Sequence, residues 1–301
     1  MTAPSQSPGR TPAAEVAIDV ALARELVASQ HPDLGSLPIV PLATGWDNAV
    51  FRLGADYVLR LPRRSLAAPL ILHEQRWLPL LAGRLPLRIP VPLRIGRPQG
   101  RYPWAWSILP WIEGEPSDQA PLLSGEATRL AEFFAALHVE APADAPRNPY
   151  RGVPLAERAA MFEARAALLA DAGRPLDAAL RTIWADALAA PLDVAPTWLH
   201  GDPHPRNVLV AGGRITGIID WGDVAAGDRA ADLAGIWLLL SQPEARSQAF
   251  GALPSVSAAT WRRARGWALL YGVILSAAGL AGDARMAAIG AATFARLDAR
   301  R

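Results

Sequence analysis

The residues best suited to chemistry lie together in one stretch of the chain, Trp198–Ala234. It opens with His200-Gly201-Asp202 and reaches Asn207, after which one apolar run leads to Gly212-Gly213 and a second leads to Asp220. Because glycine enters the left-handed backbone region at little cost, the Gly-Gly pair predicts a β-hairpin between the two runs. A hairpin brings its two ends together, so we expect Asp202, Asn207 and Asp220 to converge.

Two carboxylates and an amide held close together would be unfavourable without a cation between them, because like charges repel at short range. Carboxylate and amide oxygens are also the hard donors that Mg²⁺ prefers. The stretch therefore predicts a Mg²⁺ site, with Asn207 and Asp220 as metal ligands, beside a catalytic Asp202.

The order of these residues, H-x-D-x-x-x-x-N followed by D-x-G, is typical of phosphoryl transferases of the protein-kinase type. The chain resembles the aminoglycoside phosphotransferase family of small-molecule kinases, whose catalytic loop reads H-G-D-x-x-x-x-N. Two further motifs of that family are matched, I-D-x-x-D by Ile219–Asp223 and G-D-x-x-x-D-L-A by Gly227–Ala234. The run Leu59–Arg64 is similar to the macrolide phosphotransferase branch.

The resemblance implies that Asp202 is the catalytic base, which accepts or orients the proton of the acceptor's hydroxyl group. It also implies supporting roles around this base. His200 would orient the loop by hydrogen bonding to backbone, and Asp228 would tie the backbone of the catalytic loop. Asp223 would assist metal or acceptor binding or cap a helix, and Asp232 would cap or support the helix that begins there.

His204 is assigned no role by its spacing. It lies four residues after His200, like a zinc-binding pair on a helix, but Pro203 and Pro205 exclude that helix.

A nucleotide site is expected from residues earlier in the chain. Gly45 and Asn48 belong to a turn placed where kinases cover the phosphates, although a plain hairpin turn would look the same. By the resemblance, Arg60 takes the place of the usual phosphate-anchoring lysine and Glu74, on the next helix, holds it. Arg63 and Arg64 read as ordinary solvated charges. The segment from Leu109 to Ile112 would be the hinge that binds the base of ATP or GTP.

The elements that must position these residues change character along the chain. Short strand patterns, with one helix inserted, precede residue 110, and amphipathic helices dominate after it. We therefore expect an α+β, protein-kinase-like fold with two lobes: a disordered tail over 1–14, a small β-rich nucleotide-binding lobe over 15–110, and a larger helical lobe over 111–301 that carries the catalytic loop and the acceptor site. Strands are predicted over 39–42, 49–53, 57–61, 89–95 and 104–109, and helices over 18–30, 73–81, 126–138, 154–170, 176–190, 232–240, 261–280 and 284–297. The Pro-rich segment Ala141–Pro154 is expected to be a surface excursion.

Composition excludes several classes of protein. The chain has 301 residues, no Cys and a net charge of +2, and its 30 basic residues are all Arg and scattered. We expect no disulfides, no nucleic-acid partner, no membrane span, a cytoplasmic location and a monomer or homodimer. The missing Lys is unusual for an ATP site.

Two other functions compete with a kinase. A two-metal phosphoesterase would need further His ligands downstream, and none follows His204. A kinase-fold protein that binds nucleotide without catalysis would be expected to lose one of Asp202, Asn207 and Asp220, yet all three are present. The hydroxyl acceptor stays open among aminoglycosides, macrolides and other small molecules, because fold alone does not choose among them.

Overall fold

The computed structural model describes residues 13–298, which form two compact units. The N-terminal unit comprises the described residues up to Glu113 together with Gly217–Gly222. The C-terminal unit comprises Gly114–Thr216 and the chain from Asp223 onward. Asp220 therefore belongs to the N-terminal unit although it lies late in the sequence. Residues 1–12 of the expected tail lie outside the described part of the chain. Within that part, no helix combines the length and apolar character needed to cross a bilayer.

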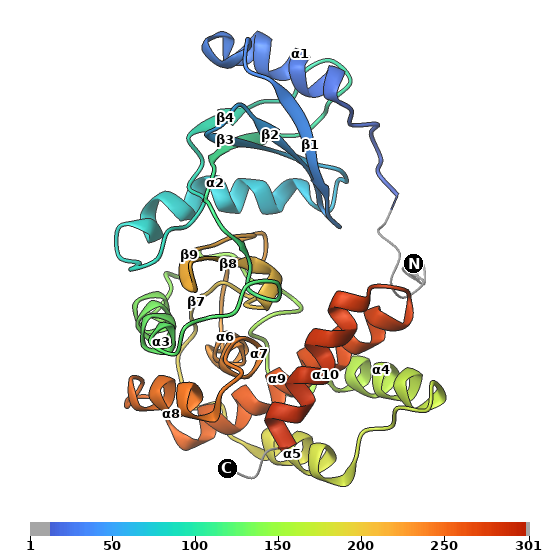
Figure 1. The fold of residues 1–301 in the computed structure, drawn as a ribbon, viewed down its shortest axis with the longest axis vertical. Helices are drawn as coiled ribbons and strands as arrows, with labels where there is room; N and C mark the ends of the chain where they lie inside the picture. The colour runs from blue at the N-terminus through green and yellow to red at the C-terminus, as the bar shows by residue number, and fades with distance from the viewer. Residues whose placement is uncertain (1–12, 299–301) are drawn as a thin grey trace. The chain divides into compact units, whose positions relative to one another are not determined.

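The N-terminal unit is built on a five-stranded antiparallel sheet with a helix on each face (Figure 1). The strand order is β1-β2-β3-β5-β4, so the predicted meander of the first three strands is confirmed. Helix α1 begins at Asp19, whose carboxylate accepts a hydrogen bond from the Leu22 N–H. The elements are α1 (Val20–Gln30), η1 (Pro32–Leu34), β1 (Ile39–Thr44), β2 (Asn48–Leu53), β3 (Tyr57–Pro62), α2 (Ala68–Ala82), β4 (Arg94–Gly96) and β5 (Trp106–Pro110).

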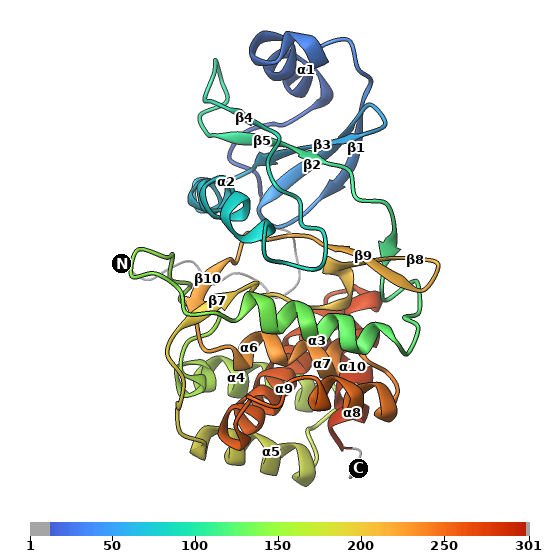
Figure 2. The ribbon, with the colours of Figure 1, turned by 90° about the vertical axis from the view of Figure 1, so that its left-hand side faces the viewer.

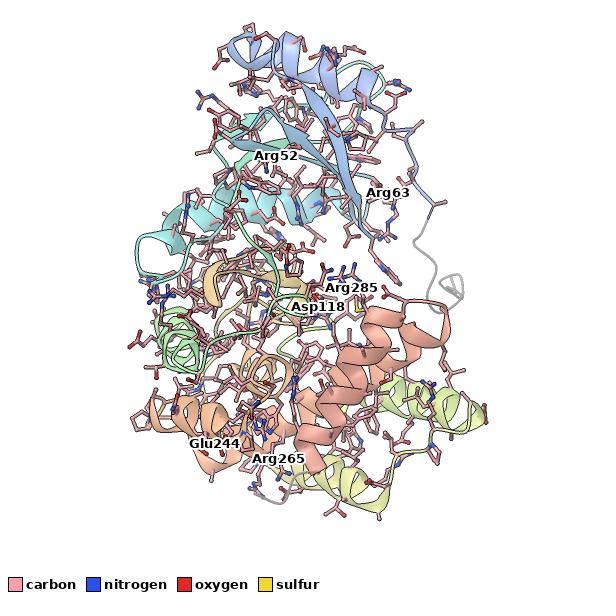
Figure 3. The ribbon with its side chains drawn as sticks, in the orientation of Figure 1. Arg52, Arg63, Asp118, Glu244, Arg265 and Arg285 are labelled. Carbon is pink, nitrogen blue, oxygen red and sulfur yellow. The ribbon has the colours of Figure 1, made fainter. Side chains whose placement is uncertain are left out.

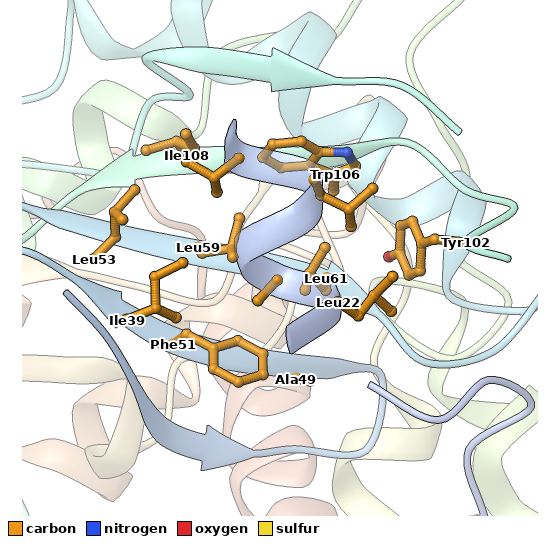
Figure 4. Packing of buried hydrophobic residues seen from close by; sticks show 13 residues of the cluster. Leu22, Ile39, Ala49, Phe51, Leu53, Leu59, Leu61, Tyr102, Trp106 and Ile108 are labelled. Carbon is orange, nitrogen blue, oxygen red and sulfur yellow. The ribbon is translucent and has the colours of Figure 1, made fainter. Parts of the chain in front are cut away.

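The core of this unit lies between α1 and the sheet, where Leu22 packs with strand residues such as Leu59 and Leu61 (Figure 4). The ring of Trp106 completes this core and is fully buried. A Cβ atom at Gly96 would lie 1.8 Å from that ring, so only glycine fits in β4 opposite it. The close approach of β4 holds β5, the strand that contains Leu109.

The strand predicted over residues 89–95 is mostly absent, and only Arg94–Gly96 pairs with β5. Pro90 and Pro92 have no N–H to donate, which excludes this part of the chain from a regular ladder. Arg88 instead forms a single parallel bridge with Gly217, and its carbonyl accepts from the Ile218 N–H at 2.9 Å. This bridge attaches the short segment that carries Asp220 to the N-terminal unit.

The C-terminal unit is mainly helical, and the 23-residue helix α9 packs against α4, α5, α6 and α10 (Figure 2). Two small sheets accompany the helices, β10-β7 and β6-β8-β9. The elements are β6 (Glu115–Pro116), α3 (Glu126–Leu137), η2 (Leu155–Arg158), α4 (Ala159–Asp171), α5 (Ala178–Ala189), β7 (Thr197–Leu199), η3 (Pro205–Asn207), β8 (Val208–Ala211), β9 (Arg214–Ile218), β10 (Ala225–Gly227), α6 (Ala230–Leu233), α7 (Gly235–Leu239), α8 (Pro243–Gly251), α9 (Ala258–Leu280) and α10 (Ala284–Asp298).

The predicted hairpin is confirmed, since β8 and β9 are neighbours in their sheet. Gly212 and Gly213 have φ angles of 56° and 76°. Positive φ at both central residues is the requirement of a type I′ turn, which explains the glycine pair. Because β8 begins directly after Asn207, the hairpin sets where the catalytic loop ends.

Two helical predictions need correction, and one helix was not predicted. The helix expected over 154–170 starts with the 3₁₀ turn η2, and the one expected over 232–240 is divided into α6 and α7 at Gly235. A Cβ atom at Gly235 would lie 3.2 Å from both the Phe134 ring and the Pro203 carbonyl oxygen, so glycine permits a close approach here. Helix α8 was not predicted because it is largely polar and buries only Ala245, Arg246 and Ala249.

Candidate active site

The catalytic loop runs from β7 to β8 and is held by its own side chains. Gly201 has φ 88°, and a Cβ atom there would lie 2.7 Å from the Asp223 carbonyl oxygen, so glycine is required. His200 Nδ1 accepts from the Asp202 N–H at 3.2 Å, which confirms that His200 hydrogen-bonds the loop backbone. Asn207 donates from Nδ2 to the Asp202 carbonyl oxygen at 3.0 Å. The structure thus brings together the predicted base and one predicted metal ligand.

Asp232 ties the backbone of this loop. That role was expected of Asp228. Its fully buried carboxylate accepts from the His200 N–H at 2.7 Å and from the Gly201 N–H at 2.8 Å. The Nε2 atom of His138 lies 3.2 Å from the same carboxylate. Hydrogen bonds to a charged acceptor are stronger than neutral ones, so Asp232 fixes the start of the loop firmly.

Asp228 has the capping role that was expected of Asp232. Its Oδ1 accepts from the Ala230 N–H at 3.1 Å, at the start of α6. Its carboxylate also receives two hydrogen bonds from the buried guanidinium of Arg263, at 2.7 and 3.2 Å. Asp228 therefore joins α6 to α9. Arg263 could not be found from sequence because it lies 35 residues away in a helix with no motif.

Both oxygens of the Asp202 carboxylate have basic neighbours. Arg151 Nη2 donates to Oδ1 at 3.2 Å, and His204 Nε2 lies 3.3 Å from Oδ2. His204 Nδ1 accepts from the Arg206 N–H at 3.1 Å, so Nε2 carries the ring proton and donates to Asp202. Burial opposes ionisation of Asp202, but His204 and Arg151 outweigh it and hold its pKa below the usual range. Asp202 is therefore a carboxylate at neutral pH.

Arg151 links Asp202 to Asp223. Its Nε donates to Asp223 Oδ2 at 3.2 Å, and Asn148 Nδ2 donates to Asp223 Oδ1 at 2.7 Å. The guanidinium lies 5.2 Å from the ring of Tyr271, whose hydroxyl donates to the Gly201 carbonyl oxygen at 2.7 Å. Arg151, Asn148 and Tyr271 were not predicted, because no local pattern marks them.

The segment Ala141–Pro154 lies at the surface, as expected, but its backbone is also tied to the strands near the catalytic loop. Its backbone is hydrogen-bonded to β10, from the Ala226 N–H to the Pro146 carbonyl oxygen at 2.8 Å and from the Asp228 N–H to the Gly152 carbonyl oxygen at 2.7 Å. Gly152 has φ 64°, and a Cβ atom there would lie 2.2 Å from the Leu199 side chain. The segment therefore lies directly on β10 and on β7, the strand that leads into the catalytic loop.

In the N-terminal unit, the structure brings Arg60, Glu74 and Asp220 together. Arg60 Nη2 lies 2.9 Å from Glu74 Oε1 and 2.7 Å from Asp220 Oδ1. Burial disfavours the charged form of Arg60, but Glu74 and Asp220 outweigh this effect and raise its pKa. Asp220 has φ 62°, and it is the one non-glycine residue with positive φ in the described chain. Such backbone strain concentrates at functional sites.

The turn at Gly45–Asn48 is fastened to the end of β3. Arg63 Nη1 donates to the Gly45 carbonyl oxygen at 2.8 Å, and Arg64 Nη2 lies 2.6 Å from Asp47 Oδ1. The Arg64 side chain is only 12% exposed, so the interpretation of Arg64 as an ordinary solvated charge was wrong. Gly45 itself has no steric need to be glycine, since a Cβ atom there would meet nothing closer than 3.7 Å.

Leu109 and Ile112, the expected hinge residues, are both buried in the N-terminal unit. Leu109 pairs with Val58 in the sheet, and the Trp111 N–H donates to the Asp56 carbonyl oxygen at 2.7 Å. A Cβ atom at Gly217 would lie 2.8 Å from Ile112, so the Asp220 segment packs closely on the hinge. That these residues bind the base of a nucleotide stays a prediction.

A cavity of about 640 Å³ lies in the C-terminal unit between residues 117–124, α10 and Pro205 of the catalytic loop. At its edge Arg285 forms a bidentate pair with Asp118, at 2.7 and 2.8 Å (Figure 3). The volume of this cavity falls within the range of small-molecule sites.

Comparison with known proteins gives the family. A profile described as the phosphotransferase enzyme family, APH, matches residues 38–267. Viomycin phosphotransferase of Streptomyces vinaceus is 32% identical over 206 residues, which cover 61% of this chain and 68% of that protein.

Solved structures share the fold. The GDP complex of an aminoglycoside 2'-phosphotransferase-IIIa has a TM-score of 0.65 at 22% identity, over 93% of this chain and 98% of that one. The macrolide 2'-phosphotransferase MphH of Brachybacterium faecium has a TM-score of 0.60 at 23% identity, over 91% and 97% of the two chains. The expected α+β, kinase-like fold is thereby confirmed. Since the profile covers most of its length and the viomycin enzyme is a clear relative, this chain belongs to the phosphotransferase enzyme family and is a small-molecule kinase of the aminoglycoside phosphotransferase type.

Proposed function

We propose that this protein transfers the γ-phosphoryl group of ATP or GTP to a hydroxyl group of a small molecule, with Mg²⁺ as cofactor. The observation that carries the proposal is how Asp202 is held. Its side chain lies on a loop whose backbone donates hydrogen bonds to Asp232 and His200 and accepts one from Asn207. Positioning of this kind supplies most of the catalysis in phosphoryl transfer.

In the proposed reaction, the acceptor oxygen forms a bond to the γ-phosphorus. The bond between that phosphorus and the oxygen bridging the β- and γ-phosphates breaks, and a nucleoside diphosphate leaves. Asp202 orients the acceptor's hydroxyl group and receives its proton. A carboxylate of low pKa suits this role because the transition state is loose and needs little basicity from the enzyme.

Asn207 and Asp220 each offer a side-chain oxygen of the kind that Mg²⁺ prefers. Asn207 uses Nδ2 to bind the Asp202 carbonyl oxygen, which leaves its Oδ1 out of that hydrogen bond. Asp220 supplies a carboxylate, and both are hard oxygen donors. Mg²⁺ held by Asn207 and Asp220 would neutralise charge on the phosphates when bound. Mg²⁺ is usually held by one or two side chains together with substrate phosphates, which agrees with so small a ligand set.

The nucleotide phosphates would bind near Arg60. Its Nε is buried without a hydrogen-bond partner, as are Arg64 Nε and the Oδ1 atom of Asn48. Buried polar atoms without partners are rare in folded proteins, and they mark places where a ligand completes the hydrogen bonding. We propose that Gly45 and Asn48 border the phosphates, that Arg60 with Glu74 binds them, and that Leu109 and Ile112 border the base. Neighbouring structures of the fold contain GDP, which supports a nucleotide co-substrate.

The acceptor is proposed to be a small molecule, with antibiotics among the candidates. The curated relative is named for viomycin, and neighbouring structures of this fold contain kanamycin, gentamicin or streptomycin. A cytoplasmic location is proposed because the chain has no cysteine and its reaction uses ATP or GTP.

A transfer assay tests the proposal. The protein is incubated with ATP or GTP, Mg²⁺ and a panel of hydroxyl compounds, and products are searched by mass for an added phosphoryl group. Asp202→Ala should lower kcat by about 10²- to 10⁴-fold with little change in nucleotide affinity. Asp186→Ala, which removes a half-exposed partner of Arg262, is the matched control and should keep full activity. Unchanged turnover in Asp202→Ala would refute the assigned base.

The same assay separates a kinase from a nucleotide-binding protein without catalysis. Tight binding of ATP or GTP with no Asp202-dependent product in any acceptor pool would favour the binder. The family membership argues against a two-metal phosphoesterase, and phosphatase activity with Mn²⁺ in the absence of nucleotide would reopen that alternative.

A further inference from the structure

Arg158 lies next to the catalytic loop and is a cation without a counter-charge. In the described part of the chain it forms no ion pair, and its Nε is buried without a hydrogen-bond partner. The carboxylates of Asp202 and Asp223 are engaged by Arg151. Partial burial lowers the pKa of Arg158, and the like charge of Arg151 lowers it further. A half-buried cation beside another cation costs stability, so a structural reason for Arg158 is missing.

An exposed aromatic ring accompanies Arg158. The Arg158 guanidinium lies 5.3 Å from the ring of Tyr150, and Tyr150 is 61% exposed. The Tyr150 N–H donates to Asn148 Oδ1 at 2.8 Å, in a turn whose Asn148 also binds Asp223. Tyr150 is therefore held on the same segment that carries Arg151 to Asp202. The guanidinium of Arg158 and the ring of Tyr150 therefore lie together, and the side chain of Arg151 stands between them and Asp202.

We propose that the acceptor carries an oxyanionic group, of which a carboxylate is the simplest kind, in addition to the hydroxyl group that it offers to Asp202. Arg158 binds this oxyanion, and Tyr150 stacks against the adjoining part of the acceptor. A guanidinium matches the planar geometry of a carboxylate with two parallel hydrogen bonds. Binding of an anion also supplies the counter-charge that Arg158 lacks, since Arg151 is already paired with Asp202 and Asp223.

This inference rests on the proposed function and narrows its substrate class. A polycationic acceptor would place an amine near the unpaired guanidinium of Arg158, where it would be repelled. The site next to Asp202 thus favours hydroxyl compounds of negative or neutral charge over kanamycin-like polycations. The acidic residue next to Arg158 in sequence, Glu157, is exposed and does not pair with it.

Binding of a simple probe tests the site without turnover. The probe is 4-hydroxybenzoate, which has a ring for Tyr150 and a carboxylate for Arg158, and its neutral partner is 4-hydroxybenzamide. Calorimetry on the full-length protein should show tighter binding of the acid than of the amide. Arg158→Gln should weaken acid binding by about 10- to 100-fold, the range for losing a hydrogen bond to a charged group. Arg158→Lys should lose less, because it keeps the charge.

Arg262→Gln is the matched control, since it also removes one positive charge but at a half-exposed pair with Asp186. It should leave the affinity for 4-hydroxybenzoate unchanged. The melting temperature of Arg158→Gln should equal or exceed that of the unaltered protein, because no favourable ion pair is lost. Equal affinity for acid and amide, or an equal loss in both variants, would overturn the proposed oxyanion site.

Acceptors found in the transfer assay give a second, separate test. The most efficient acceptors should carry a carboxylate or another oxyanion, and Arg158→Gln should raise their KM with little effect on kcat. A protein that phosphorylates kanamycin or streptomycin with higher kcat/KM than any anionic acceptor would refute this inference and leave the proposed function intact. Absence of any Asp202-dependent transfer would instead refute the proposed function, while the binding test would still decide on the site.

Discussion

Replacing Asp232 by Asn removes the charge that holds the catalytic loop, and its cost can be estimated from the contacts. The side chain is fully buried and accepts from two backbone N–H groups, at 2.7 and 2.8 Å. An Asn side chain offers one carbonyl oxygen, so its amide group must face one of these donors. Hydrogen bonds to charged groups contribute about 1.5–3 kcal/mol each, and a buried donor left unpaired costs about 1–3 kcal/mol. We expect a loss of about 3–5 kcal/mol in the free energy of unfolding.

Urea unfolding followed by tryptophan fluorescence measures this loss from the midpoint and slope of the transition. The control is Asp186→Asn, which alters a half-exposed ion pair and should change stability by less than about 0.5 kcal/mol. Amide hydrogen exchange adds a local readout. Exchange at His200 and Gly201 should accelerate in Asp232→Asn. In Asp228→Asn it should stay slow, because Asp228 binds Arg263 and α6 instead.

A stability of Asp232→Asn within about 1 kcal/mol of the unaltered protein would refute this reasoning, because the two charge-assisted hydrogen bonds would then contribute almost nothing. Equal acceleration of exchange in the Asp228 variant would show that the loop is held by the whole α6 region and not by one carboxylate.

Three further variants, one of them double, test the site and the fold. The double variant Arg60→Gln/Glu74→Gln replaces a buried ion pair by two neutral partners. It should raise the nucleotide KM by about 10- to 100-fold. An unchanged KM would mean that another arginine anchors the phosphates. Gly201→Ala should destabilise the protein by at least about 1–3 kcal/mol and lower kcat, because alanine is strained at φ 88° and its Cβ atom would meet Asp223. Gly251→Ala is the control and should be tolerated, because a Cβ atom there has open space. Calorimetric melting compares the two variants. Hydrogen bonds from Ser257 and Arg263 outweigh burial and lower the pKa of Asp193 in the folded protein. The ionised Asp193 side chain therefore contributes its full stabilisation above the pKa of about 4 that it has in the unfolded chain, and this stabilisation is lost as the pH falls through the folded pKa. Asp193→Asn should therefore flatten the fall in urea midpoint between about pH 4 and pH 2, and an unaltered slope would contradict the assignment.

The catalytic hairpin could be read from sequence because all of its signals are local. Gly212-Gly213 determines the turn, the apolar runs on either side form β8 and β9, and the spacing from Asp202 to Asn207 is a fixed feature of one loop. The sheet of the N-terminal unit was equally accessible, since β1, β2 and β3 are joined by short turns. The prolines at 90 and 92 limited the next strand in a way that apolar character alone conceals.

The parts that were missed depend on contacts between distant residues. Asp228 and Asp232 lie in one short motif, and nothing local tells which carboxylate turns toward the loop and which toward Arg263. Arg151 meets Asp202 across 51 residues of sequence, from a segment whose prolines suggested only a surface loop. Arg64 looked like a solvated charge at the end of a strand, and its pair with Asp47 became evident only when β2 and β3 were placed side by side.

The proposed role of Arg60 as the phosphate anchor has a practical consequence for chemical labelling of this protein. The sequence contains no lysine. A nucleotide-based reagent that acylates an amine beside the phosphates needs a nitrogen that can lose its proton, and a guanidinium that stays protonated offers none. Such a reagent should leave Arg60 unmodified, whereas an Arg60→Lys variant would offer it an amine.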